Sequence, residues 1–128
     1  MKILITGGAG FIGSHAAEYY MRQGEDVIVF DNLKRNEILG INSNSSTENW
    51  NYLKSLGKIK LVSGDIRDFK QLKEVSNGCE AIIHTAAQVA VTSSVANPRI
   101  DFEINALGTF NVQEVARIND CSLIYSST

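Results

Sequence analysis

The sequence predicts an α/β fold, a doubly wound parallel sheet with helices on both faces. Two observations carry this prediction. Short apolar, β-branched runs alternate with segments of helical periodicity along all 128 residues. The runs are apolar on both faces, which is typical of parallel strands that helices cover on both sides.

The N-terminal part contains two predicted strands with a helix between them. Residues 2–6, KILIT, form an apolar run that ends in glycines. A helix is expected at 11–24, with Ile12 on its apolar face and Gly24 as its stop signal. The second strand is predicted at 26–30, DVIVF.

The middle of the chain interrupts the alternation of strands and helices. Residues 32–57 have a polar centre, INSNSSTEN, that is rich in turn-forming residue types. This composition predicts a loop of about a dozen or more residues, followed by a helix from about Thr47. Loops of this length are often functional.

The rest of the chain returns to alternation. Three more strands are expected within 58–65, 80–86 and 122–127, and a short helix at 69–78. A long helix is predicted at 98–119, because proline suits a first helical turn and apolar residues recur at helical spacing. The face expected to pack inward consists of Ile100, Ile104, Leu107, Asn111, Val115 and Ile118.

The composition is that of one globular domain and argues against several classes of function. With 44% hydrophobic and 20% charged residues, the chain can bury a core without disulfides. A net charge of −2 gives no electrostatic reason to expect nucleic acid or an anionic membrane as a partner. Cys79 and Cys121 match no metal-binding spacing, so reduced thiols and no metal site are expected. No apolar run reaches the length of a membrane span or forms a signal-peptide core, which favours a cytoplasmic protein.

The stretch TGGAGFIG, between the first strand and the first helix, is the first candidate site. Gly7, Gly10 and Gly13 follow the spacing G-x-x-G-x-x-G, one residue wider than the dinucleotide fingerprint. Glycines let the backbone approach phosphates closely, and a helix N-terminus offers N–H groups and partial positive charge. We expect the amides of Phe11 and Ile12 to bind a pyrophosphate, although glycine turns also occur for packing alone.

Asp31 follows the second strand, where an acid can accept hydrogen bonds from the adenosine ribose hydroxyls. The alternative role for it is capping a turn or helix. A carboxylate here favours NAD over NADP, because two unit charges about 4 Å apart at an effective dielectric near 20 repel by roughly 4 kcal/mol. Lys34 and Arg35 could offset this repulsion but are interpreted as solvated loop residues.

These motifs, together with GDIRD, HTAAQ, NALGTFNV and YSST, resemble the extended short-chain dehydrogenases/reductases, in particular the nucleotide-sugar epimerases and dehydratases. Within this family, QVAVTSSVANPRIDFEIN (88–105) and IYSST resemble the CDP-paratose 2-epimerases, also called CDP-tyvelose epimerases. The resemblance covers the whole chain. It implies a Rossmann-type sheet with strand order 3-2-1-4-5, truncated after the fifth strand, and an NAD-binding domain over 1–128.

The resemblance also implies positions around the cofactor. Asp65 and Ile66 are expected to bracket the adenine, with the acid accepting from its exocyclic amine. Asn105 is similar to an asparagine of the family that lines the cofactor, and a polar side chain on an apolar helix face needs a partner in any case. The other cofactor-binding residues implied are Asn32, Leu33, Lys34 and Arg35 at the adenosine ribose, and Ala86, Ala87 and Gln88 on the nicotinamide side.

Thr128 matches the catalytic Ser/Thr of the family, whose hydroxyl bonds to the sugar oxygen that is oxidised. The family's acid/base pair, Tyr-x-x-x-Lys, is absent from the chain, and so is the domain that holds the nucleotide-sugar. The ending LIYSST is therefore interpreted as a cut end, and the fragment is expected to be inactive.

His84 is interpreted as a hydrogen-bonded core residue. For 92–94, the sequence leaves open contact with substrate or capping of a helix.

The function expected of the intact enzyme is NAD-dependent epimerisation of a nucleotide-sugar. The resemblance favours a CDP-sugar, with CDP-paratose converted to CDP-tyvelose at C2 through a transient keto-sugar. The alternatives are a nucleotide-sugar 4-epimerase, a 4,6-dehydratase and a non-catalytic NAD-binding module. The intact enzyme is expected to form a homo-oligomer.

Overall fold

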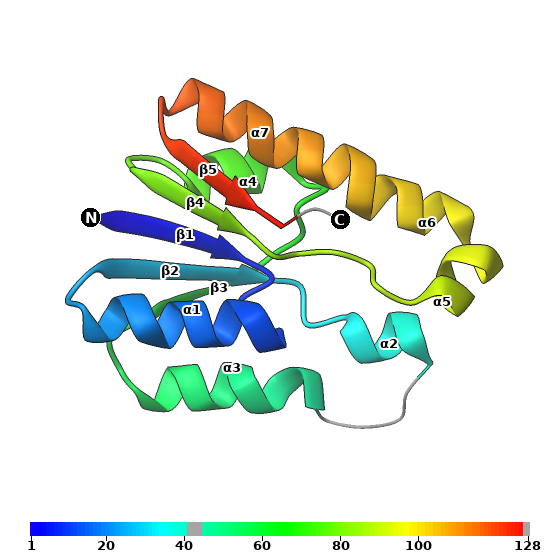
Figure 1. The fold of residues 1–128 in the computed structure, drawn as a ribbon, viewed down its shortest axis with the longest axis horizontal. Coiled ribbons are helices and arrows are strands. Elements are labelled where there is room, and N and C mark those ends of the chain that lie inside the picture. The colour runs from blue at the N-terminus through cyan, green and yellow to red at the C-terminus, as the bar shows by residue number, and fades with distance from the viewer. Residues whose placement is uncertain (41–44, 127–128) are drawn as a thin grey trace.

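The computed structural model describes residues 1–40 and 45–126. Its centre is a sheet of five parallel strands in the order β3-β2-β1-β4-β5, as predicted (Figure 1). The last strand of the described chain is the fifth, at one edge of the sheet. The strands are β1 (Lys2–Thr6), β2 (Asp26–Asp31), β3 (Lys60–Ser63), β4 (Ala81–His84) and β5 (Ser122–Tyr125).

Helices cover both faces of this sheet. Helices α1 and α3 pack on one face, and α4 and α7 pack on the other (Figure 1). The helical segments are α1 (Phe11–Arg22), α2 (Arg35–Leu39), α3 (Ser45–Ser55), α4 (Phe69–Val75), α5 (Val91–Ala96), α6 (Pro98–Phe102), η1 (Glu103–Gly108) and α7 (Thr109–Ile118). Among the described residues, no helix is long and apolar enough to cross a bilayer.

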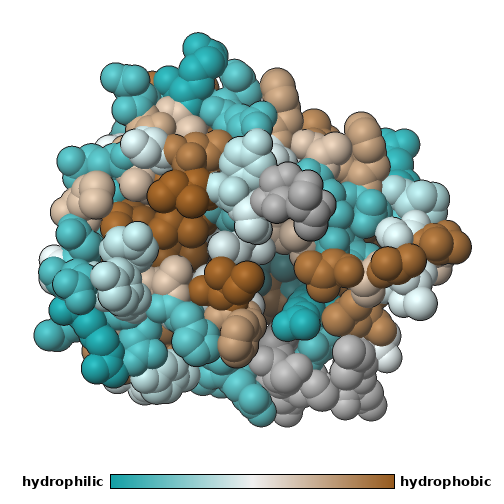
Figure 2. Space-filling model, in the orientation of Figure 1, coloured by the Kyte–Doolittle hydropathy of each residue, from teal (hydrophilic) through white to brown (hydrophobic). Residues whose placement is uncertain are grey.

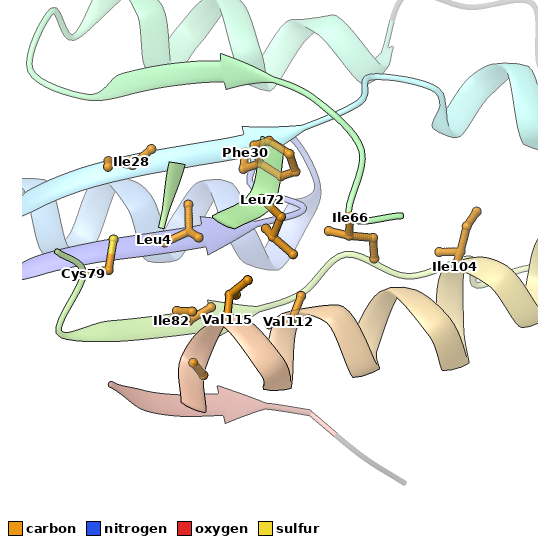
Figure 3. Packing of buried hydrophobic residues seen from close by; sticks show 11 residues of the cluster. Leu4, Ile28, Phe30, Ile66, Leu72, Cys79, Ile82, Ile104, Val112 and Val115 are labelled. Atoms are coloured by element: carbon orange, nitrogen blue, oxygen red, sulfur yellow. The ribbon is translucent and has the colours of Figure 1, made fainter. Parts of the chain in front are cut away.

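The central strands divide their side chains between two cores. Alternate residues of a strand point to opposite faces of the sheet, so an apolar run supplies both cores. Leu4, Ile28 and Ile82 pack toward α4 and α7, as Figure 3 shows. Ile3 and Val27, which pair in the β1–β2 register, pack toward α1 and α3. Each such fully buried side chain stabilises the fold by about 1.5–3 kcal/mol.

The predicted loop after β2 contains more helix than expected. Residues 35–39 form the short helix α2, which ends at Gly40 with φ +64°. Helix α3 begins at Ser45, two residues before the predicted start, and residues 41–44 lie outside the described part of the chain. A second unpredicted helix, α5, follows β4. Helices of five or six residues are too short to show a 3.6-residue period, which is why the pattern missed them.

The predicted long helix is continuous but changes its geometry midway. Pro98 occupies its first turn, and the Asn97 side chain caps it by accepting from Ile100 N–H. Segment η1 is π-helical, so its hydrogen bonds span one residue more than in an α-helix. Ile104, Asn111 and Val115 are buried as predicted, so most of the expected face is kept. Leu107 and Ile118, predicted to pack inward, are exposed instead, and the buried set after the π-turn is Gly108, Asn111, Val112, Val115 and Ala116.

Candidate functional site

A cavity of ≈ 520 Å³ lies at the carboxyl ends of the strands, where ligands bind in open α/β sheets. Loops after β1, β2, β3 and β4 supply its walls, and α3 supplies one more. Twelve of the sixteen predicted cofactor residues line it: Gly7, Gly10, Phe11, Ile12, Gly13, Asp31, Asn32, Arg35, Asp65, Ile66, Ala86 and Ala87. The four that do not are Leu33, Lys34, Gln88 and Asn105.

The turn between β1 and α1 needs glycine for its own packing. Gly7 has φ +70°, and a Cβ on it would lie 2.5 Å from the backbone N of Ala86. A Cβ on Gly13 would lie 2.4 Å from the carbonyl O of Gly7. These close approaches bring the start of α1 against the end of β4. The sequence left open that these glycines serve packing, and the structure shows that they do. The same turn also forms part of the cavity wall.

The first turn of α1 opens into the cavity. Gly10 is its N-cap residue and has no side chain to accept from the first-turn N–H groups, and the turn contains no acidic residue. Phe11 and Ile12 line the cavity with exposures of 73% and 63%. Ile12 thus does not lie on the packed face, contrary to expectation, because Ala17 and the small residues 13 and 14 fill that face. A helix start of this kind attracts an anion.

Asp31 is the last residue of β2 and holds two backbone groups. Its Oδ2 accepts from Ala9 N–H at 2.9 Å, and its Oδ1 accepts from Leu33 N–H at 2.8 Å. The second bond coincides with a φ of 59° at Leu33, an uncommon value for a residue other than glycine. Burial raises the pKa of the Asp31 carboxyl, while the two N–H groups oppose that rise. Each oxygen retains a further lone pair with which to accept from a hydroxyl.

Asp65 faces the same cavity with its carboxylate already engaged. Oδ1 accepts from N and Nε of Arg67 at 2.9 and 3.0 Å. Oδ2 accepts from Nη2 of Arg67 at 2.8 Å and from Nδ2 of Asn32 at 3.1 Å. The hydrogen bond from Arg67 lowers the pKa of Asp65 from 3.8 to about 2. Four donors fill the roughly four acceptor sites of a carboxylate, so an adenine amine would have to share or displace one of them.

Asn105 lies outside the cavity and fixes the loop that follows β4. Its Oδ1 accepts from Gln88 N–H at 2.8 Å, and its Nδ2 donates to Gln88 O at 2.9 Å. A third bond joins Nδ2 to Asp101 at 3.1 Å. The partner expected for this polar side chain is therefore present, and the residue itself is exposed.

The other candidates have structural roles or lie outside the described residues. His84 is buried between two threonines, with Nδ1 2.6 Å from Thr6 Oγ1 and Nε2 3.0 Å from Thr109 Oγ1. This confirms the core role predicted for it. Residues 92–94 lie inside α5, whose N-cap is Ala90, so they are not caps. Thr128, the predicted catalytic residue, lies outside the described residues.

Helix α3 contributes to the site although no sequence motif indicated it. Glu48 and Asn49 line the cavity, and Asn49 donates from Nδ2 to the carbonyl O of Ala9 at 3.1 Å. The sequence pattern assigns both residues only to a helix after a loop. Their role depends on how α3 docks against α1, a tertiary contact that local patterns do not encode.

The segment that follows β4 exposes several valines, of which Val89 lines the cavity. Val89, Val91 and Val95 are each at least two-thirds exposed. Figure 2 shows brown, hydrophobic side chains gathered at the α5 end of the molecule. The lining of the site thus varies in chemistry, with the carboxylates of Asp31 and Asp65 at the ends of β2 and β3 and the apolar Val89 after β4.

Residues 4–128 match the family described as GDP-mannose 4,6 dehydratase. The chain belongs to this family. The resemblance to nucleotide-sugar epimerases and dehydratases is thereby confirmed. The CDP-paratose 2-epimerase of Salmonella typhi is 44% identical over 135 residues, an alignment that covers 100% of this chain and 37% of that protein. The chain therefore spans little more than a third of the length of this relative.

Solved structures of UDP-glucose 4-epimerases share the fold. The UDP-glucose 4-epimerase of Thermotoga maritima, solved with UDP-glucose, is 32% identical with a TM-score of 0.82 and is matched over 100% of this chain and 38% of its own. The UDP-glucose 4-epimerase of Thermus thermophilus, solved as a complex with NAD, is also 32% identical, with a TM-score of 0.74 and the same coverage.

Proposed function

We propose that the cavity binds NAD and that the chain is the cofactor-binding part of a nucleotide-sugar epimerase. The observation that carries this proposal is the opening of the α1 N-terminus, which has no capping side chain, onto the same cavity as the Asp31 carboxylate. One feature suits a pyrophosphate and the other a ribose diol. The NAD complex of the Thermus thermophilus relative supports the choice of cofactor.

Each part of the cofactor has a proposed place among the residues of the cavity. The N–H groups of Phe11 and Ile12 hold the pyrophosphate, and Asp31 accepts from the adenosine ribose. Asp65 and Ile66 border the adenine. Ala86, Ala87 and the loop that Asn105 fixes at Gln88 border the nicotinamide, whose role when bound is to accept a hydride from the sugar and return it.

Binding of NADH, followed by its fluorescence, tests the cofactor proposal. We expect saturable binding and weaker binding of NADPH, because the extra phosphate would lie beside the carboxylate of Asp31. Absence of saturable binding, or equal affinity for the two cofactors, would contradict the assignment of NAD.

Turnover is proposed for the whole protein and not for these 128 residues alone. By resemblance, the hydroxyl of Thr128 bonds to the sugar oxygen that is oxidised. The family also uses a tyrosine as the acid/base on the sugar hydroxyl and a lysine four positions later. None of Tyr19, Tyr20 and Tyr52 has a lysine at that spacing. The chain by itself is therefore proposed to bind the cofactor without epimerising a sugar.

The proposed substrate is a CDP-sugar that is epimerised at C2. The 44% identity to the CDP-paratose 2-epimerase supports it. Epimerisation at C4 of a UDP-sugar is the second candidate, favoured by the likeness to the Thermotoga maritima structure with UDP-glucose. Assays of the whole protein with CDP-paratose and with UDP-glucose discriminate between them. Conversion of only the UDP-sugar would overturn the first candidate, and NAD binding without conversion of either would indicate a non-catalytic module.

A further inference from the structure

The peptide group between Ala9 and Gly10 leads directly into the N-terminus of α1. Its N–H, from Gly10, donates to the carbonyl O of Gly7 at 3.0 Å. Its carbonyl, from Ala9, accepts from Nδ2 of Asn49 at 3.1 Å. The peptide plane is therefore held at both edges. The next amides along the chain are those of Phe11 and Ile12.

Ala9 is also tied to the acid at the end of β2. Its N–H donates to Asp31 Oδ2 at 2.9 Å, and the residue is only 6% exposed. Both backbone polar groups of Ala9 thus bind side chains from other elements, 22 and 40 residues away in sequence. A reorientation of Ala9 would disturb the helix start and the Asp31 carboxylate together.

Helix α3, which carries Asn49, is fixed against the rest of the fold by a buried side chain and a hydrogen bond. Leu53, one helical turn after Asn49, is fully buried in the core beneath α1 and α3, and residues four apart share a helix face. Tyr52 adds a hydrogen bond from its hydroxyl to Glu18 of α1 at 2.9 Å. In Figure 1, α3 lies alongside α1. The amide of Asn49 consequently reaches Ala9 from a docked helix and not from a loop.

We infer that Asn49 is a positioning residue of the dinucleotide site, an inference that rests on the function proposed above. It acts through the Ala9 carbonyl to set the orientation in which the first amides of α1 meet the pyrophosphate. Loss of its donor leaves a partly buried carbonyl without that partner and frees the peptide plane. Dinucleotide affinity then falls even though Asn49 is assigned no contact with the cofactor.

Variants of Asn49 test the inference through the dissociation constant for NADH. Asn49→Leu removes the donor at similar size, and Asn49→Asp replaces it with a group that only accepts. We expect Asn49→Leu to raise the dissociation constant about 10-fold and Asn49→Asp to raise it at least as much. Asn49→Gln retains an amide donor and should stay within about 3-fold of the unmodified protein. The matched control is Asn51→Leu, the same change at an exposed position of α3, which should stay within about 2-fold.

Thermal unfolding without ligand separates positioning from support of the fold. If Asn49 only stabilises the fold, Asn49→Leu lowers the unfolding midpoint but leaves the dissociation constant, measured well below that midpoint, unchanged. That result would overturn the inference, as would equal losses for Asn49→Gln and Asn49→Leu. If the leucine variant does not fold, Asn49→Asp replaces it in the comparison with Asn49→Gln. A larger rise in the dissociation constant for Asn49→Asp supports the inference, and equal values for the two variants overturn it. Failure of the unmodified protein to bind NADH would instead refute the proposed function.

Discussion

At the residue scale, the site consists of backbone groups that distant side chains hold in place. Asp31, Asn49 and Asn105 each bind main-chain atoms of a loop at the cavity or beside it. The sequence predicted Asp31 because acids at the end of a second strand have a known role. It predicted a cofactor-lining role for Asn105 through the family resemblance, and a hydrogen-bond partner for it from its place on an apolar helix face. It could not predict Asn49, whose partner lies 40 residues away and belongs to no motif.

Replacing the Asp31 carboxylate by an amide should weaken NADH binding. In Asp31→Asn, one oxygen becomes an NH₂ group that cannot accept from a backbone N–H or from a ribose hydroxyl. We expect the dissociation constant for NADH to rise by about 10- to 100-fold and the preference for NADH over NADPH to shrink. Titration with both cofactors measures this. Asp26→Asn, at the exposed opposite end of β2, is the matched control and should leave both affinities unchanged.

Two glycines with nearly the same φ angle should respond differently to alanine. Gly7 and Gly57 have φ of +70° and +69°, but a Cβ on Gly7 would collide with Ala86, whereas a Cβ on Gly57 meets nothing within 4 Å. Gly57→Ala should cost about 1 kcal/mol of backbone strain, and Gly7→Ala about 1–3 kcal/mol more. Chemical denaturation of both variants measures the difference. Equal losses would mean that the turn is not packed against β4 as described.

At the element scale, predictions were correct where periodicity was long and failed where it was short or broken. The five strands and the helices α1, α4 and α7 follow from their apolar patterns. Helices α2 and α5 were missed because five or six residues carry no period. In the π-turn η1, Gly108 is buried where Leu107 was expected, whereas Asn111 and Val115 beyond it are buried as predicted. Gly108 fits there because a Cβ would lie 2.5 Å from Ile66.

His84 joins β1, β4 and α7 and should make stability depend on pH. Burial lowers the pKa of its imidazole from 6.5 to about 4, so the unfolded chain binds the proton more readily than the folded chain. Its contribution is therefore fully present above pH 6.5 and is lost as the pH falls toward 4, by up to about 3 kcal/mol.

The free energy of unfolding, measured from about pH 7 to pH 4 for the unmodified protein and for His84→Gln, tests this. Carboxylates also destabilise both proteins in acid. The quantity to compare is therefore the slope of the free energy of unfolding against pH in the variant and in the unmodified protein. We expect the variant to be less stable near neutral pH and to lose less stability below pH 6.5. His15→Gln, on the exposed surface of α1, serves as the control. Parallel curves for His84→Gln and the unmodified protein would show that His84 does not remain neutral.

At the scale of the whole molecule, the topology explains why so much of the site was predictable. In a parallel sheet all strands end at one edge, so motifs that follow β1, β2, β3 and β4 must meet there. That rule gathers Gly7, Asp31, Asp65 and Ala86 around one cavity although they are far apart in sequence. The rule does not determine how a helix without a motif docks. The contribution of α3 to the cavity therefore could not be predicted from the sequence and is seen only in the structure.

A crystal structure of the protein with saturating NAD tests the central claim most directly. We expect pyrophosphate oxygens within hydrogen-bonding distance of the backbone N atoms of Phe11 and Ile12, and ribose hydroxyls on the carboxylate of Asp31. An NAD molecule bound elsewhere, or density absent from this cavity while the turn at Gly10 is ordered and open, would contradict the account.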